Sequence, residues 1–311
     1  MNIENRVTIC VMTIFILISS CASGQSNSEK ELLVDGRTYV KTIGKGNPVL
    51  IINGGPGLDS EGFKSLADGL SDEYQMILFD QRGTGKSPLA KLDSTTLKLD
   101  SMVMDLEHIR TALGLDDWVL LGHSFGGMLA SYYTAKFPER VRGIILSSSG
   151  GIDLQLLTDG FDITAGLSQQ NRDSLAYYGE LAREEGTSTK VWNAYCQFLA
   201  PAYLYDQKYV SLVADRLSRV NREINGQIWS DMRNMNFDCS ESLSTFKEPV
   251  LIIQGEHDVL SKDLAFYADS VFAKSKLVFV DQAAHYGWLE NPETYYGEVR
   301  DYLSAIYRKG E

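Results

Sequence analysis

Short apolar runs alternate with longer amphipathic segments along most of this chain. Six runs have the length and residue types of buried strands, at 39–43, 48–52, 75–79, 118–121, 141–147 and 276–280, and residues 97–113 have helical spacing. Between residues 151 and 246 only helical spacing remains, until another buried run begins at Pro249. The pattern predicts an α/β fold with a mostly parallel central sheet and helices on both faces. A helical cap at 151–246 would interrupt a core made of residues 31–150 and 247–311.

The first thirty residues do not fit this core. Arg6 precedes an apolar run over residues 7–18, which is short for a membrane span and has the length of a signal-peptide core. The run ends in Ser19-Ser20-Cys21, which resembles the cleavage site of a bacterial lipoprotein. We therefore expect a signal peptide at 1–21, lipidation of Cys21 and a polar tether at 22–30. The protein would then be anchored by lipid in the cell envelope, facing the periplasm or the exterior.

Charge and cysteine content limit the kinds of ligand and cross-link that we expect. The net charge is −12 with no basic block, so a nucleic acid is not expected as a partner. No Cys/His spacing suggests a metal site. Outside the cytoplasm Cys196 and Cys239 could form a disulfide, but the sequence leaves open whether they come within reach.

The run Gly122-His123-Ser124-Phe125-Gly126 is the most informative stretch of the chain. It fits Gly-x-Ser-x-Gly, follows a strand-like run and precedes small and apolar residues at helical spacing. A serine on such a sharp strand-to-helix turn presents its hydroxyl above the sheet, and the glycines avoid clashes across the turn. We therefore expect Ser124 to be a nucleophile.

A serine nucleophile needs a base and an acid that orients the base. His285 follows the last predicted strand, from where it can reach back over the sheet edge. Asp258 follows the strand-like run that begins at Pro249, and in chain order it lies between the serine and the histidine. Glu256 is the alternative acid, whereas Asp281 is too close to His285 in sequence to orient it easily. The expected triad is Ser124, Asp258 and His285, which needs no cofactor or metal.

An oxyanion formed during acyl transfer requires two N–H groups aimed at one point. One is expected from Phe125, directly after the nucleophile. The other is expected from the glycine-rich loop that follows the strand at 48–52, with Gly55 as the first choice and Gly54 as the second.

These motifs together resemble the α/β-hydrolase family and, within it, the proline iminopeptidase branch. The narrower likeness lies in Gly54-Gly-Pro-Gly57 and in Asp80-Gln-Arg-Gly-Thr-Gly-Lys-Ser87. The resemblance implies an aminopeptidase that releases N-terminal proline or similar residues from peptides. It also implies acidic residues in the cap that hold the substrate ammonium, with Glu223 as the candidate and Glu184 and Glu185 as alternatives.

Two other functions remain open on the sequence. An esterase, or another hydrolase of small acyl compounds, would use the same triad with a cap suited to neutral substrates. A binding protein on this fold would need no catalysis, although such proteins usually lack one member of the triad. The substrate is therefore expected to be a small peptide or a small acyl compound.

Overall fold

The computed structural model describes residues 28–159, 161–184 and 188–308. Its eight strands form one sheet in the order β1-β2-β4-β3-β5-β6-β7-β8. The β2 strand is antiparallel to β1 and to β4, and all other neighbours are parallel. The strands are β1 Glu29–Val34, β2 Thr38–Ile43, β3 Asn47–Ile52, β4 Tyr74–Phe79, β5 Trp118–His123, β6 Val141–Ser147, β7 Val250–Gly255 and β8 Ser275–Val280.

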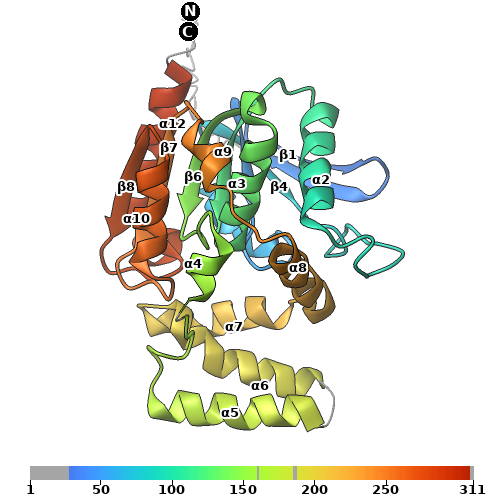
Figure 1. The fold of residues 1–311 in the computed structure, drawn as a ribbon, viewed down its shortest axis with the longest axis vertical. Coiled ribbons are helices and arrows are strands. Elements are labelled where there is room, and N and C mark those ends of the chain that lie inside the picture. The colour runs from blue at the N-terminus through green and yellow to red at the C-terminus, as the bar shows by residue number, and fades with distance from the viewer. Residues whose placement is uncertain (1–27, 160, 185–187, 309–311) are drawn as a thin grey trace, which may run out of the picture.

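Helices fill the connections between the strands (Figure 1). The α-helices are α1 Lys64–Asp68, α2 Leu99–Ala112, α3 Phe125–Lys136, α4 Leu154–Thr158, α5 Gln169–Glu184, α6 Thr189–Leu199, α7 Val210–Ser218, α8 Arg222–Asn234, α9 Ser240–Ser244, α10 Lys262–Val271, α11 Gly287–Glu290 and α12 Pro292–Tyr307. Four short 3₁₀ helices are η1 Glu61–Phe63, η2 Pro138–Arg140, η3 Ala200–Tyr203 and η4 Gln207–Tyr209.

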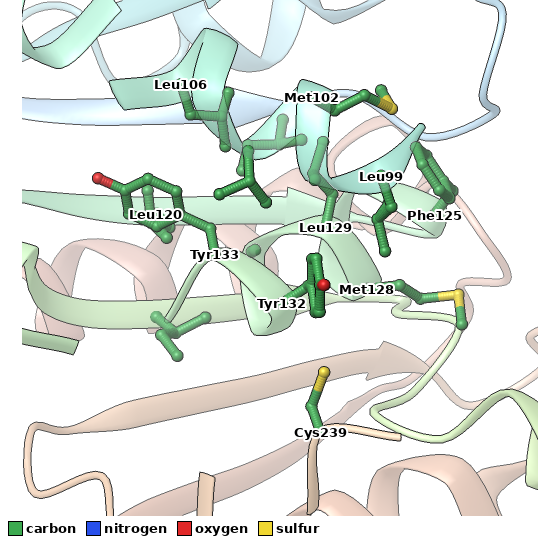
Figure 2. Close-up of a cluster of buried hydrophobic side chains, with 14 of the residues drawn as sticks. Leu99, Met102, Leu106, Leu120, Phe125, Met128, Leu129, Tyr132, Tyr133 and Cys239 are labelled. Carbon is green, nitrogen blue, oxygen red and sulfur yellow. The ribbon is translucent and has the colours of Figure 1, made fainter. Parts of the chain in front are cut away.

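Both faces of the sheet are buried, which explains why its central strands are continuous apolar runs. In β3, Leu50 and Ile52 belong to a cluster with residues of α2, α3 and α10, whereas Val49 and Ile51 belong to a cluster with residues of α1 and α12. Figure 2 shows part of the first cluster, in which Leu129 of α3 lies beside residues of α2. The predicted α/β fold is thus confirmed, because one sheet is covered by helices on both sides.

The helical insertion lies between β6 and β7. Figure 1 shows α5, α6 and α7 stacked below the sheet, with α8 beside them, on the side where the β5-to-α3 turn opens. The α9 helix instead packs next to α3, against the core. The sole pairing of β type in this insertion, among residues that the structure describes, is the bridge between Asp153 and Asp238.

The first described strand corrects one boundary. We expected a tether up to Lys30, but β1 already begins at Glu29 and pairs with β2 along its whole length. Glu29 also forms ion pairs with Lys41 at 2.9 Å and Lys64 at 3.1 Å. The strand is largely exposed at the sheet edge, and its first half, Glu29 to Glu31, is charged, so it carries no buried-strand pattern. The expected signal peptide, the lipidation site Cys21 and most of the tether lie outside the described residues.

Candidate active site

Ser124 occupies a strained turn between β5 and α3. Its backbone has φ 56° and ψ −123°, a conformation that costs a non-glycine residue free energy and that is found mainly at functional sites. The turn is held by hydrogen bonds from the Ser124 N–H to the Ser147 carbonyl at 3.1 Å and from the Gly127 N–H to the Ser124 carbonyl at 2.9 Å. This is the geometry that places a serine hydroxyl above the sheet.

The glycines of the turn are required by close approach of the backbone. A Cβ at Gly126 would lie 2.0 Å from the Ile52 carbonyl oxygen, and one at Gly122 would lie 2.4 Å from the Gly126 carbonyl oxygen. Neither oxygen can move without moving a strand or the turn itself. The sequence argument for glycine at both positions therefore has a direct structural cause.

His285 and Asp258 meet at the ends of β8 and β7. The His285 Nδ1 lies 2.9 Å from the Asp258 Oδ1, and the side chains are 4% and 1% exposed, respectively. The Leu260 N–H donates to the same Oδ1 at 3.1 Å, which fixes the carboxylate. The other two carboxylates do not contact His285. Glu256 is exposed and paired with Lys262, and Asp281 is exposed and accepts a hydrogen bond from the Gln282 N–H. The structure thus brings His285 together with Asp258 and with neither alternative.

Ser124 and His285 line one cavity of about 300 Å³ beneath the helical insertion. Its walls are mainly apolar, and its basic side chains are those of His285 and Arg233. The other lining residues are Phe125, Met128, Gly150, Leu154, Leu157, Thr158, Phe161, Ile163, Tyr203, Trp229, Val259 and Leu260. A cavity of this size and character is suited to a small substrate.

The glycine loop after β3 closes over Ser124. A Cβ at Gly54 would lie 2.7 Å from the Ser124 Cβ, so the loop backbone runs directly beside Ser124. Gly55 has φ +72°, which glycine adopts without strain. Phe125 begins α3, and the first N–H groups of a helix have no acceptor within it. Both expected oxyanion donors therefore belong to segments that flank Ser124.

The Asp80–Ser87 segment holds the glycine loop through hydrogen bonds. Asp80 accepts hydrogen bonds from the Ser60 N–H at 2.9 Å and hydroxyl at 2.7 Å, and from the Lys86 N–H at 2.8 Å. Gln81 Nε2 donates to the Asn53 carbonyl at 2.9 Å. The motif that carried the resemblance is therefore a scaffold for the glycine loop, and none of its residues lines the cavity.

Glu290 fixes the histidine loop against the helical insertion, and no local motif in the sequence indicates this role. Its carboxylate accepts from the N–H groups of Ala284 at 2.7 Å, Tyr205 at 2.7 Å and Asp206 at 2.8 Å. Burial raises the pKa of this carboxyl despite the three donors. The His285 N–H in turn donates to the Tyr203 carbonyl at 3.1 Å. The position of His285 thus depends on contacts with residues some eighty positions earlier.

Glu223, the first candidate to hold a substrate ammonium, does not line the cavity. Glu223 is exposed in the first turn of α8, and it is not among the lining residues. Glu184 is the last residue of α5, and Glu185 lies outside the described residues. The α8 residues that do line the cavity are Trp229, whose ring packs 5.8 Å from the Phe125 ring, and Arg233.

The remaining histidines and the cysteines have other surroundings. His123 is buried among the rings of Phe63, His285, Tyr286 and Trp288, and burial holds its pKa well below the usual value, so it is neutral. Cys196 and Cys239 are free and buried, and the possible disulfide is absent. Within the part of the chain that the structure describes, no group of three or more His, Cys, Asp or Glu side chains could hold a metal ion. None of the helices there has the length and apolar character to cross a membrane.

Comparison with known proteins agrees with the fold. The sequence profile described as alpha/beta hydrolase fold matches residues 47–292. Proline iminopeptidase of Heyndrickxia coagulans is 28% identical over 285 residues, covering 85% of this chain and 92% of the relative. Proline iminopeptidase of Saccharolobus solfataricus is 24% identical over 284 residues, covering 85% and 87%.

Solved structures show the same architecture. An alpha/beta fold family hydrolase from Bacillus anthracis superposes with a TM-score of 0.72 at 20% identity, covering 88% of this chain and 99% of that one. Proline iminopeptidase of Mycobacterium smegmatis superposes with a TM-score of 0.68 at 19% identity, covering 91% and 100%. The matched profile and the curated relatives establish that this chain belongs to the α/β-hydrolase fold family, as a proline iminopeptidase-like member.

Proposed function

We propose that this hydrolase is a serine hydrolase in which Ser124 is the nucleophile, His285 the general base and Asp258 the acid that orients the base. The proposal rests on one observation: His285, which lies 2.9 Å from the buried Asp258 carboxylate, lines the same cavity as a serine on a strained turn. Such a constellation is recognised by its geometry and by the role of each group.

The reaction follows from these positions. His285 Nε2 takes the hydroxyl proton as the Ser124 Oγ bonds to the substrate carbonyl carbon, and the carbonyl π electrons move to oxygen. The N–H groups of Phe125 and Gly55 stabilise that oxyanion. Collapse breaks the bond to the leaving group, which takes the proton from His285. Water then repeats the sequence on the acyl-enzyme and frees Ser124, while the Asp258 carboxylate stabilises each imidazolium.

The proposed reaction is release of an N-terminal proline or similar residue from a peptide. The curated relatives named proline iminopeptidase support this substrate class. The apolar wall of the cavity, including Met128 and Leu157, suits a pyrrolidine ring. Because no carboxylate lines the cavity in the described part of the chain, the ring face of Trp229 is the candidate partner for the ammonium.

The charge of Arg233 favours a second candidate function, the hydrolysis of small acyl esters. Arg233 is the one cavity-lining residue, among those described, that carries a permanent charge, and its charge would repel a substrate ammonium. A neutral acyl ester carries no ammonium, so the charge of Arg233 would not weaken its binding. Hydrolysis of small acyl esters by the same triad is therefore the alternative.

Matched substrates test the two candidates. Proline p-nitroanilide, its N-acetyl derivative and p-nitrophenyl butyrate should be assayed on the unmodified protein, with Ser124→Ala as the blank. The aminopeptidase proposal expects the free proline compound to be cleaved at least tenfold better than the blocked one. Equal cleavage of the free and blocked compounds, or activity on the ester alone, would favour the esterase. No cleavage of any substrate would favour a binding protein.

The same substrates test whether Glu223 contacts a bound peptide. If its carboxylate contacts the bound peptide in spite of its exposed position, Glu223→Gln should lower kcat/KM for proline p-nitroanilide and spare the ester. Arg233→Gln should raise kcat/KM for the same amine, because it removes a like charge. An unchanged value for Glu223→Gln would remove that residue from the site.

We also propose that Cys21 is lipidated and that the protein is held in the bacterial cell envelope, facing the periplasm or the exterior. Support comes from the sequence alone, in the apolar run at 7–18 and in Ser19-Ser20-Cys21. The catalytic core begins several residues after this cysteine, so lipidation and catalysis are separable.

A further inference from the structure

A second cavity lies on the far side of the histidine loop from the catalytic cavity. Its volume is about 380 Å³, within the usual range of about 300–1,000 Å³ for small-molecule sites. It shares no lining residue with the catalytic cavity. The residues around it come from η1, α1, α7 with the residue after it, and α11 with the residue before it, and they include Glu61, Leu212, Val213, Arg216, Tyr286 and Leu289. We call this space the Arg216 cavity.

Arg216 is the unusual residue of this cavity. It is 7% exposed, and its Nε and Nη1 have no hydrogen-bond partner among the described residues. Other well-buried arginines are fully engaged: Arg82 pairs with Asp105 through two hydrogen bonds, and Arg110 pairs with Glu107 in the same way. A buried charged group without a partner destabilises a fold, so stability does not explain why an arginine occupies this position.

Neighbouring rings hold the guanidinium in place without satisfying it. Its central carbon lies 4.0 Å from the Phe63 ring centroid and 5.2 Å from that of Tyr286. Gly62 leaves room for the side chain, since a Cβ there would lie 2.8 Å from the Arg216 Cδ. Stacking on rings uses the faces of a guanidinium and leaves its N–H groups, which lie in its plane, available to an acceptor.

The nearby carboxylates are engaged elsewhere or exposed. Asp59 and Asp215 both pair with Arg219, at 3.4 Å and 3.9 Å. Glu61 is exposed at the rim of the cavity. Apolar side chains also line the wall, with Val213 buried and Leu212 55% exposed. An exposed leucine beside a buried cation marks a site with a place for both a charged and an apolar group.

We propose that the Arg216 cavity binds a small organic monocarboxylate, with the carboxylate on Arg216 and a short apolar chain against Val213, Leu212 and Leu289. A carboxylate supplies the acceptor that the guanidinium lacks. A compact dianion such as phosphate fits less well, because Glu61 and Asp215 repel it and it leaves the leucines uncovered. The site does not use Ser124, so it is independent of the proposed function.

This position gives the ligand contact with the catalytic loop. Tyr286, whose ring covers one side of the guanidinium, directly follows His285 in the chain. Phe63, the other ring beside the guanidinium, lies 5.3 Å from the His123 ring, which lies 4.6 Å from the His285 ring. A bound carboxylate therefore lies one layer of aromatic rings behind the catalytic histidine.

Hexanoate is the probe, with hexanol and inorganic phosphate as controls, measured by calorimetric titration and thermal unfolding of the full chain. Hexanoate should bind and, at about a hundred times its Kd, raise Tm by about 3 °C or more. Hexanol and phosphate should bind at least tenfold more weakly. Equal binding of hexanol or phosphate, or no binding of hexanoate, would overturn the proposal.

Variants identify the site. Arg216→Met should abolish hexanoate binding, and without ligand it should be at least as stable as the unmodified protein because it removes an unpaired buried charge. Arg219→Met is the matched control, since Arg219 is already ion-paired, and should keep the binding. Leu212→Glu changes an exposed residue and should weaken binding about tenfold even if Arg216→Met fails to fold. Binding that survives Arg216→Met or Leu212→Glu but is lost in Arg233→Met would assign the anion to the catalytic cavity and refute the proposal.

Discussion

Replacing Asp258 by asparagine isolates the charge of the triad from its geometry. The Leu260 N–H donates to Asp258 Oδ1 at 3.1 Å, and the same oxygen lies 2.9 Å from His285 Nδ1. In Asp258→Asn the amide oxygen should occupy this place, because the NH₂ group would face the Leu260 N–H. Oδ2 has no partner among the described residues, so the NH₂ group can take its position. His285 should keep its orientation and lose only the facing negative charge.

The size of the loss follows from Coulomb's law. Unit charges about 4 Å apart attract by about 4 kcal/mol at an effective dielectric constant of about 20. The side chains are 4% and 1% exposed, so solvent screens this attraction little. A transition state that forms an imidazolium should therefore rise by about 4 kcal/mol, which lowers kcat about 10³-fold. KM should change little, since Asp258 does not line the cavity.

The assay is kcat for whichever chromogenic substrate the unmodified enzyme cleaves best. Asp258→Ala should lose at least as much, because it also removes the acceptor that orients His285. Glu256→Gln is the matched control, as this exposed carboxylate pairs with Lys262, and it should retain most activity. A fall of less than tenfold in Asp258→Asn, or a larger fall in Glu256→Gln, would refute the assignment of the acid.

Three further outcomes follow from the structure and the sequence. Gly126→Ala should destabilise the protein by about 2 kcal/mol or more in urea unfolding, because its Cβ would lie 2.0 Å from the Ile52 carbonyl oxygen. The control Gly226→Ala, within α8, meets open space and should stabilise the protein by about 0.5–1 kcal/mol. The reverse order of stability would contradict the packing. Burial raises the pKa of the Cys196 and Cys239 thiols to about 12, so at pH 8 about one thiol in 10⁴ is ionised and iodoacetamide should modify both only after unfolding; rapid labelling of the native protein would show that they are accessible. Cys21→Ser should abolish labelling by a clickable fatty acid and leave activity on soluble substrates intact, and equal labelling of both forms would refute the lipoprotein proposal.

The turn that carries Ser124 was predictable because its signals are local. Gly122 to Gly126 combine a strand end, a turn and a helix start within a few residues, and glycines are required there by short contacts. The order of Ser124, Asp258 and His285 follows from strands that are recognisable as buried apolar runs. A sheet buried on both faces gives its strands a pattern that depends little on the rest of the chain.

The specificity of the cavity was not predictable, since it depends on contacts between distant segments. Trp229 and Arg233 line the cavity, whereas Glu223, six residues before Trp229 on the same helix, is exposed. Which face of α8 turns toward Ser124 is decided by packing, through Ile224, Ile228 and Met232. The helical spacing of the sequence shows that such a face exists but not what lies opposite it.

The edge strand β1 was missed for a related reason. An exposed strand at a sheet edge has no buried apolar run, and Glu29 and Lys30 are polar residues that suit a tether equally well. Its pairing with β2 and the ion pairs of Glu29 hold it in place. These are tertiary interactions, which a local pattern does not reveal.

Covalent trapping tests whether Ser124 is a nucleophile that His285 activates. The protein should be treated with a fluorophosphonate, and the site of the adduct should be located by mass spectrometry of its peptides. We expect one adduct per chain, on Ser124, that forms at least about 10³-fold more slowly in His285→Ala. An adduct on another serine, or equal rates of labelling in the two proteins, would contradict it.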